Sequence, residues 1–361
     1  MRFACYGSSL VSAYWNGAAT YYRGLLKALA ERGHSILFAE PDAFDRQSHR
    51  DIDNPVWAEV LVYEPDESGM SRALAAANGA DVIVKFSGVG VLDEELERAV
   101  LALRRPGQMS IFWDVDAPAT LDRMESAQND PLRPLIPRFD AVFTYGGGNT
   151  VVRAYRRFGA QLCVPIYNAL DPATHHPVEP DPRFAADLAF LGNRLPDREA
   201  RVEEFFLKAA ALLPSRRFLL GGNGWRDKSM PANVAYAGHV YTRDHNAFNA
   251  TPLAVLNVNR ESMARYGASP PTRIFEAAGA SACIISDVWP EIEKFLEPGK
   301  EILLAKNGED VAHTLEALDE QKARLIGEAA RRRVLFEHTY ALRASQVESV
   351  LEGRMKLREA V

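Results

Sequence analysis

The 361-residue sequence is poor in cysteine, in long apolar runs and in net positive charge. Its three cysteines, Cys5, Cys163 and Cys283, stand far apart in separate apolar runs, so no disulfide or zinc-site spacing is present. No apolar run approaches the roughly 18 residues that a membrane-spanning helix needs. The net charge is −6, so the chain lacks the excess of basic residues that is typical of nucleic-acid-binding proteins. These absences predict buried thiols, no transmembrane segment and no nucleic-acid partner.

The remaining composition is that of a globular protein, with 47% hydrophobic and 25% charged residues. Met1 leads directly into an apolar run, which leaves no room for a signal peptide. Together with the scattered thiols, this predicts a cytoplasmic location. The length predicts two domains of about 150 residues each.

The first half alternates short apolar runs with helical periodicity, which predicts a doubly wound parallel sheet. Strands are expected at Arg2–Tyr6, His34–Ala39, Val60–Tyr63, Asp81–Lys85, Met109–Trp113, Ala141–Thr144 and Leu162–Ile166. The loop after the first strand lacks the G-x-G-x-x-G spacing, which disfavours dinucleotide binding. Ligands of such sheets bind at the carboxyl ends of strands. The residues expected to line a ligand site there are Gly7, Ser8, Asn16, Gly17, Asp114, Asp116, Gly146 and Gly147.

A segment dense in proline, from Asn168 to Pro182, predicts a linker between the two halves. Its pair His175-His176 is adjacent rather than spaced i, i+4, which favours a polar linker over a metal site. In the second half, strands are expected at Leu188–Leu191, Phe218–Leu220 and Val234–Ala237, and a helix at Glu199–Leu213. Glycine follows each of these strands, a sign that backbone closely approaches another group at that edge. The strand-end residues concerned are Gly192, Asn193, Arg194, Gly222, Asn223, His239 and Val240.

The stretch from Leu253 to Asp287 organises the second half. An expected strand, Leu253–Val258, is followed by a polar loop with Asn259 and Arg260. Ser269 is expected to cap a helix whose first turn holds two prolines. On that helix Thr272, Arg273 and Glu276 share one side, so phosphate can meet the helix N-terminus and Arg273 while Glu276 accepts bonds from sugar hydroxyls. The competing interpretation is a solvated Arg–Glu pair on an ordinary amphipathic helix.

The sequence Arg273-x-Phe275-Glu276-Ala277, followed by small residues and an apolar strand, resembles the donor-site helix of GT-B glycosyltransferases. More narrowly, together with Trp15-Asn16-Gly17, it resembles the spore-maturation-protein-like (CgeB-like) group. The resemblance implies two Rossmann-like domains facing a central cleft. It places an acceptor domain at residues 1–170, a nucleotide-sugar donor domain at 171–340, and a terminal helix, 341–361, back on the first domain.

The resemblance also implies a nucleotide-sugar donor, UDP-linked before dTDP- or GDP-linked, and an acceptor that the sequence does not reveal. The implied donor-binding residues are Gly192, Asn193, Arg194, Gly222, Asn223, His239, Val240, Asn259, Arg260, Thr272, Arg273 and Glu276. Asp114-x-Asp116 matches the metal motif of GT-A glycosyltransferases, but the Glu276 helix favours the metal-free alternative. We therefore expect no metal or cofactor, Asp116 as general base or acceptor-orienting carboxylate, and Asp114 as a second catalytic or a structural residue.

One departure from the family pattern bears on mechanism. Many retaining GT-B enzymes carry two glutamates separated by seven residues, and the first would fall at Ala268. The stereochemical outcome therefore stays open. Two alternatives also remain: a sugar-nucleotide epimerase or hydrolase of the same fold, and a non-catalytic nucleotide-sugar-binding protein, which Ala268 weakly favours.

Overall fold

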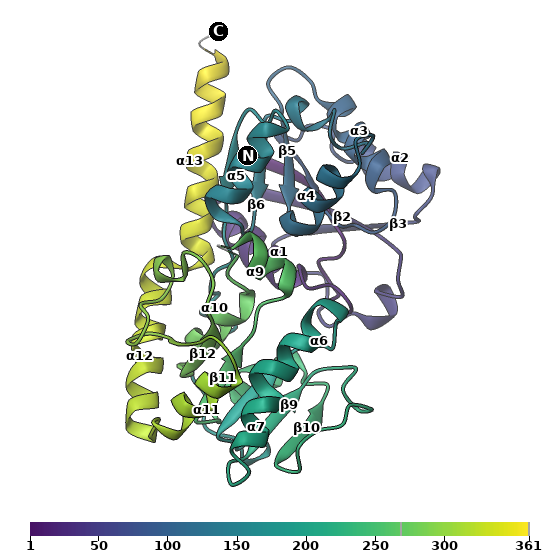
Figure 1. Ribbon diagram of the computed structural model, residues 1–361. Helices are drawn as coiled ribbons and strands as arrows, with labels where there is room; N and C mark the ends of the chain where they lie inside the picture. Colours follow the sequence, from purple (N-terminus) through teal and green to yellow (C-terminus); the bar gives the residue numbers. More distant parts are fainter. Residues whose placement is uncertain (268, 360–361) are drawn as a thin grey trace. The chain divides into compact units, whose positions relative to one another are not determined.

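The computed structural model describes residues 1–267 and 269–359. They divide into two compact units (Figure 1). Unit 1 comprises Met1–Tyr167 and the C-terminal segment that starts at Tyr340, and unit 2 comprises Asn168–Thr339. Each unit is built on one parallel sheet, of seven strands in unit 1 and six in unit 2. The predicted pair of Rossmann-like doubly wound domains is confirmed.

The sheet of unit 1 has the strand order β3-β2-β1-β4-β5-β6-β7. Its strands are β1 (Arg2–Tyr6), β2 (Ser35–Pro41), β3 (Glu59–Tyr63), β4 (Val82–Phe86), β5 (Met109–Asp114), β6 (Ala141–Thr144) and β7 (Cys163–Pro165). The order reverses between β1 and β4, which is the point where doubly wound sheets bind ligands. The loops that begin at Gly7 and Ser87 therefore flank the topological switch of unit 1.

The helices of unit 1 cover its sheet with apolar faces; α1, for example, buries Tyr22, Leu25 and Leu29. They are α1 (Ala19–Glu31), η1 (Gln47–His49), α2 (Glu67–Ala75), α3 (Asp93–Leu103), α4 (Ala117–Ser126), η2 (Ile136–Arg138), α5 (Gly148–Arg157) and α13 (Tyr340–Glu359). The long helix α13 packs on α1. Glu348 of α13 pairs with Arg32 and His34 at 2.5 and 2.8 Å.

Strand β4 and helix α3 carry a cluster of charged side chains that are buried or nearly so. Lys85 of β4 is fully buried and its Nζ donates to Asp93 at 2.6 Å. Glu97, one turn further along α3, is 3% exposed, and its Oε2 has no hydrogen-bond partner among the described residues. Burial raises the pKa of the Glu97 carboxyl to about 7, an effect that Lys85 partly offsets. Ionised Glu97 is thus a source of instability in unit 1.

We expect the Glu97→Gln variant to be more stable than the wild type at alkaline pH. A carboxyl whose pKa is higher in the folded protein makes stability fall as pH rises, here between about 4.5 and about 7. The shift bounds the penalty at about 3 kcal/mol above that window. Thermal melts at pH 8 should show a raised melting temperature, with little change at pH 4.5. Glu95→Gln, an exposed neighbour on α3, is the control, and equal effects of both variants would contradict the prediction.

The sheet of unit 2 has the order β10-β9-β8-β11-β12-β13. Its strands are β8 (Leu188–Leu191), β9 (Phe218–Gly221), β10 (Val234–Gly238), β11 (Ala254–Asn257), β12 (Ile284–Asp287) and β13 (Leu303–Ala305). Here the order reverses between β8 and β11. The segments that start at Gly192 and Val258 therefore flank the switch point of unit 2.

The helices of unit 2 pack on its sheet through one apolar cluster, in which Phe190 and Leu256 of the sheet meet Phe206 and Leu315 of the helices. They are η3 (Pro182–Phe184), α6 (Pro196–Val202), η4 (Glu203–Leu207), α7 (Lys208–Leu212), η5 (Thr242–Asp244), α8 (His245–Ala250), α9 (Glu261–Tyr266), α10 (Thr272–Gly279), η6 (Ile292–Lys294), α11 (Gly308–Glu316) and α12 (Glu320–Glu337). The helix predicted at Glu199–Leu213 is α6 and α7 joined by a π-helical turn, η4.

Two details of the Leu253–Asp287 prediction are wrong. The polar loop contains the short helix α9, and Ser269 does not cap α10, because its hydroxyl donates to the Gly267 carbonyl at 3.0 Å. Helix α10 begins at Thr272, after an extended Pro271. The reason is that Pro271 keeps the preceding Pro270 out of the helical region, so the helix starts only beyond both prolines. Ala268, on which the question of a missing glutamate rests, lies outside the described residues.

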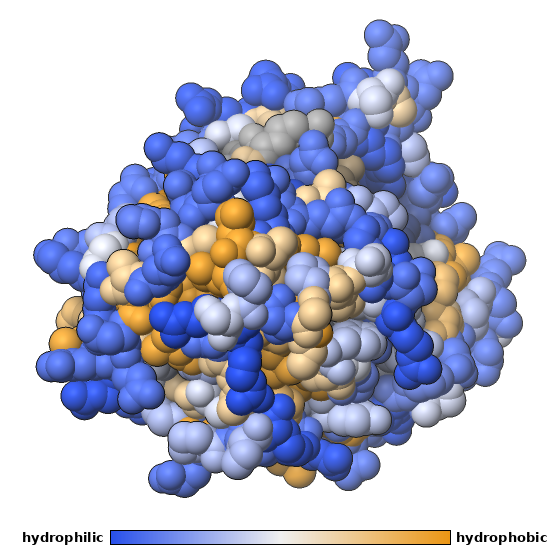
Figure 2. Space-filling view, turned by 60° about the horizontal axis from the view of Figure 1, so that its bottom comes forward, coloured by the Kyte–Doolittle hydropathy of each residue, from blue (hydrophilic) through white to orange (hydrophobic). Residues whose placement is uncertain are grey.

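Among the described residues, no helix is both long and apolar enough to cross a membrane. Figure 2 shows a face on which hydrophobic residues gather near the middle and hydrophilic residues surround them. Apolar atoms make up more than half of an ordinary folded protein's surface, so this distribution carries no functional argument by itself.

Candidate functional site

The polar side of α10 carries the carboxylate that the sequence places at the ribose. The opposite side of the helix is fully buried through Ile274, Phe275 and Ala278. The side chain of Glu276 is 13% exposed. Burial raises the pKa of Glu276, but the nearby His175, His245 and Arg273 outweigh it, and the net shift is downward. Burial lowers the pKa of Arg273, and Glu276 partly offsets that effect. Glu276 is therefore an ionised acceptor in a confined position, with Arg273 beside it.

Two histidines complete the surroundings of Glu276. His175 Nε2 lies 3.9 Å from Glu276 Oε1, and His175 is 6% exposed. The imidazole of His245, at the start of α8, joins them, with one ligand atom from each of the three residues within 4.8 Å of the others. Burial lowers the pKa of His245. The prediction that His175 is only part of a polar linker missed this proximity to Glu276.

The loops that follow β8 and β9 are bound to each other at the sheet edge. The backbone N–H of Asn223 donates to Asn193 Oδ1 at 2.9 Å, and the N–H of Arg194 donates to the Asn223 carbonyl at 2.9 Å. Gly222 has a φ of +114°, and a Cβ there would lie 2.3 Å from the carbonyl oxygen of Gly192. Only glycine permits this approach. Glycine at position 222 therefore allows the loops after β8 and β9 to contact each other.

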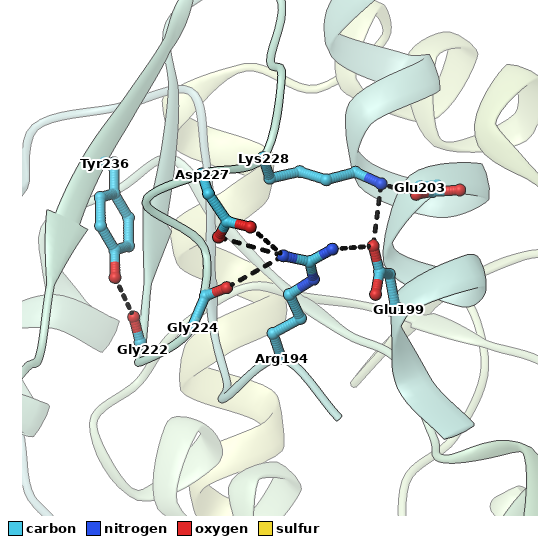
Figure 3. Close-up of polar contacts among 8 residues, drawn as sticks. All are labelled: Arg194, Glu199, Glu203, Gly222, Gly224, Asp227, Lys228 and Tyr236. Atoms are coloured by element: carbon cyan, nitrogen blue, oxygen red, sulfur yellow. Dashed lines mark hydrogen bonds and ion pairs between the residues drawn. The ribbon is translucent and has the colours of Figure 1, made fainter. Parts of the chain in front are cut away.

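Arg194 is the centre of an ion-pair network at this edge (Figure 3). Its guanidinium pairs with Glu199 at 2.7 Å and with Asp227 at 3.1 Å. Hydrogen bonds from Arg194 and Lys228 lower the pKa of Glu199 to about 2. Lys228 in turn pairs with Glu199 at 2.9 Å and with Glu203. Arg194 is thus paired with two protein carboxylates, of which Asp227 is largely exposed.

The loop after β10 reaches toward both the β9 loop and α8. Asn223 Nδ2 lies 3.4 Å from His239 Nδ1, and the Val240 carbonyl lies 3.3 Å from His245 Nε2. Tyr236 OH donates to the Gly222 carbonyl at 2.8 Å. The predicted base-reading segment, His239 and Val240, is therefore linked through His245 to the surroundings of Glu276.

Asn259 lies two residues beyond the end of β11 and is 1% exposed. Both polar atoms of its side chain lack a hydrogen-bond partner among the described residues. Its carbonyl accepts from Arg201 Nε at 2.9 Å, and Arg201 also pairs with the buried Asp287 at 2.6 Å. Arg260 pairs with Asp197 at 2.6 Å. A buried amide without partners at a switch point is a place where a ligand would supply the missing bonds. Thr272, the other predicted phosphate contact, is the first residue of α10.

In unit 1, Asp114 ends β5 and is fully buried. Its Oδ1 accepts from Ser87 Oγ at 2.7 Å, from Thr120 Oγ1 at 3.1 Å and from the Asp116 N–H at 2.9 Å, while its Oδ2 accepts from Tyr155 OH. Burial raises the pKa of Asp114, and these hydrogen bonds oppose the rise. The surroundings favour the structural alternative for Asp114, which fixes the backbone of Asp116.

Asp116 occupies the position before α4, and its side chain makes no cap bond to that helix. It is partly exposed, unlike Asp114. Its carbonyl accepts from Thr120 N at 3.1 Å, which continues the turn into α4. The two aspartates therefore differ in their surroundings, because Asp114 is fully buried among hydrogen-bond donors and Asp116 is partly exposed.

The remaining residues predicted for unit 1 shape its loops. Ser8 Oγ donates to Asn16 Oδ1 at 3.0 Å, and Asn16 Nδ2 donates to the carbonyls of Ser9 and Ser12. Asn16 thus organises the loop after β1, which begins at Gly7 and ends at Gly17 before α1. Gly147, preceded by Gly146, caps the N-terminus of α5.

Known proteins resemble this chain in fold. Residues 198–349, less than half of the chain, match the family described as glycosyl transferase-like. No curated protein sequence matches the chain. Sucrose-phosphate synthase from Thermosynechococcus elongatus is similar in structure, with a TM-score of 0.71, 14% identity and full coverage of both chains. HepE from Anabaena, solved with UDP and glucose, has a TM-score of 0.68 at 14% identity, with 98% of this chain and 100% of that chain covered.

A third similar structure is AviGT4, a glycosyltransferase involved in avilamycin A biosynthesis, with a TM-score of 0.63, 17% identity, and 100% of this chain and 99% of that chain covered. Identities this low establish the fold. The chain has the GT-B glycosyltransferase fold, and the segment that carries Arg273 and Glu276 lies within the glycosyl transferase-like match.

Sequence reasoning missed His175, His245, Arg201 and Asp287. His175 and His245 are 70 residues apart in the sequence, so no local motif predicts that they lie close together. In the sequence, Arg201 is an ordinary basic residue of a helix and Asp287 an ordinary acidic residue at the end of a strand. Only the fold brings them together beside Asn259. For Asp287, the only indication in the sequence is that an acidic residue follows Ser286 at the end of an apolar run.

Proposed function

We propose that this chain is a glycosyltransferase that moves a sugar from a nucleoside-diphosphate sugar, UDP-linked before other donors, to an acceptor. The observation that carries the proposal is the ionised, confined Glu276 on α10, next to Arg273 and linked through His245 to the loop after β10. A carboxylate in that setting suits paired ribose hydroxyls, which are neutral donors. HepE, solved in complex with UDP-glucose, supports UDP as the nucleotide.

The diphosphate would lie at the switch between β8 and β11. Helix α10, whose first residue is Thr272, would present its N-terminal N–H groups to an anion, with Arg273 adjacent. Arg194 would exchange the exposed Asp227 for a phosphate oxygen, an exchange that costs little because exposed ion pairs contribute about 1 kcal/mol or less. The unpartnered amide of Asn259 and the backbone at Gly192, Gly222, His239 and Val240 would complete donor recognition.

The acceptor side would belong to unit 1, with Asp116 as general base or acceptor-orienting carboxylate. Asp114 would act through its bond to the Asp116 N–H rather than by touching substrate. Within GT-B proteins, the Arg273–Ala277 motif favours the CgeB-like group. Three buried free thiols fit a cytoplasmic location, and the acidic net charge fits an acceptor other than nucleic acid.

A donor screen followed by a product assay tests the proposal. Thermal shift with UDP-, dTDP- and GDP-sugars should select a UDP-sugar, and UDP release should then require an added acceptor. Release without acceptor would instead indicate a hydrolase or epimerase. Binding without turnover under any acceptor would indicate a nucleotide-sugar-binding protein.

We predict that transfer is metal-independent. Asp114 is enclosed by four donors and is poorly placed to share a cation with Asp116, which leaves the diphosphate charge to Arg273, Arg194, Arg260 and the α10 N-terminus. Turnover should therefore persist in EDTA at the wild-type rate. If activity were lost in EDTA and restored by manganese, the prediction would be wrong and Asp114-x-Asp116 would be the candidate metal site.

A further inference from the structure

We propose that His175, His245 and Glu276 form a transition-metal site in unit 2, of the chemical class that binds Zn²⁺. One ligand atom from each lies within 4.8 Å of the others. His175 is buried and Glu276 nearly so. Two imidazoles and a carboxylate, with a further position left for water, form a known donor set for Zn²⁺.

The hydrogen bonds around His175 place the lone pair of its neutral ring on Nε2, the nitrogen nearer to Glu276. Thr174 Oγ1 donates its proton to the Asp171 carbonyl at 3.1 Å and lies 3.0 Å from His175 Nδ1. Because the hydroxyl proton is already used, the hydroxyl oxygen accepts from the Nδ1–H. The neutral ring then has its lone pair on Nε2, the atom 3.9 Å from Glu276 Oε1.

His245 is held in the complementary tautomer. Its Nε2 lies 3.3 Å from the Val240 carbonyl, which only accepts, so Nε2 carries the proton and Nδ1 the lone pair. A metal-ligating histidine almost always donates its other N–H to such a partner, which fixes the ring. With both rings in these neutral tautomers, the three residues would offer a cation three acceptor atoms. The bound cation would release the imidazole protons and take over the positive charge that the rings otherwise place beside Glu276.

The backbone around the three residues is tied together. Asn246 of α8 donates to the Thr174 carbonyl at 3.0 Å and accepts from the His176 N–H at 3.3 Å. A Cβ on Gly279 would lie 2.9 Å from the His175 carbonyl oxygen, so α10 closely approaches this segment. Tetrahedral Zn²⁺ needs ligand atoms about 3.3 Å apart. The ligand atoms, which lie within 4.8 Å of one another, must therefore close by at most about 1.5 Å, which side-chain rotation can supply.

Arg273 opposes a cation here, since its charge acts on both Glu276 and His245. The repulsion is the same for any divalent cation, and it is the two imidazole donors that favour Zn²⁺ over Mg²⁺ or Ca²⁺. One part of the inference rests on the proposed function: if Glu276 binds the ribose of the donor, it cannot bind the metal at the same time. Zn²⁺ would then compete with the nucleotide and inhibit transfer, and EDTA would preserve activity.

The test uses the untagged full chain, stripped of metal and freed of chelator. Titration with Co²⁺ should give visible absorption of low-coordinate cobalt at one ion per chain, displaced by Zn²⁺ and not by Mg²⁺. His175→Ala, His175→Gln and His245→Ala should each weaken Zn²⁺ binding about tenfold or more. His176→Ala, an exposed neighbour, should leave it unchanged. Thermal melts identify variants that fail to fold.

The absence of a cobalt spectrum, or Zn²⁺ binding that survives the variants at both histidines, overturns the metal site. Addition of UDP should lower the affinity for Zn²⁺ if Glu276 serves both ligands. UDP and Zn²⁺ that bind together without mutual effect would contradict that competition. Because metal binding is measured without donor or acceptor, a failed metal site and a failed glycosyltransferase proposal give different results.

Discussion

Replacement of Glu276 by alanine should weaken UDP-sugar binding by two to four orders of magnitude. A charge-assisted hydrogen bond contributes about 1.5–3 kcal/mol, and a ribose with two hydroxyls bonded to the carboxylate would lose about 3–6 kcal/mol. The environment strengthens the expectation, because the net pKa shift of Glu276 is downward and the carboxylate is ionised at neutral pH. Isothermal calorimetry with UDP and UDP-glucose measures the loss.

Two controls separate binding from folding. Glu276→Gln keeps the shape of the side chain and should preserve the fold while it weakens binding, since the amide is a poorer acceptor. Glu316→Ala removes an exposed glutamate at the end of α11 and should change neither. If Glu276→Ala binds UDP-glucose with wild-type affinity while its melting temperature is unchanged, Glu276 does not hold the ribose.

The sequence was sufficient to predict both sheets because their strands are short, apolar and bounded by glycine or proline. The strands at Ala141–Thr144 and Leu188–Leu191 have the predicted bounds. Errors arose where neighbouring prolines decide a boundary, as at Pro270-Pro271, and where a polar stretch folds into a helix, as in α9. Propensity is a weak signal over six residues, and tertiary packing overrides it.

For the candidate site, the sequence identified residue types at strand ends but not their partners. Asp114 and Asp116 look alike in a D-x-D motif, yet one accepts four hydrogen bonds from Ser87, Thr120, Tyr155 and backbone, and the other stands at the helix start. That difference depends on residues up to 41 positions away. The same limit applies to His175 and His245, which only the packing of α8 and α10 brings to Glu276.

The second large effect is expected from Asp116→Asn, which should lower turnover by roughly 10²–10⁴ while donor affinity stays near that of the wild type. Asparagine preserves the shape of the side chain but does not accept a proton. The fold should tolerate the change, because the Asp116 N–H and carbonyl, which bond to Asp114 and Thr120, are backbone groups that remain. Steady-state rates at saturating donor, together with calorimetric donor affinity, measure the two quantities separately.

The matched control is Asp53→Asn, an exposed aspartate of unit 1, which should leave turnover unchanged. Asp116→Asn with full turnover, or with donor binding reduced as much as turnover, would exclude Asp116 as the base. The search would then move to Asp114 and the Tyr145–Gly148 loop, because these lie at the ends of the neighbouring strands β5 and β6.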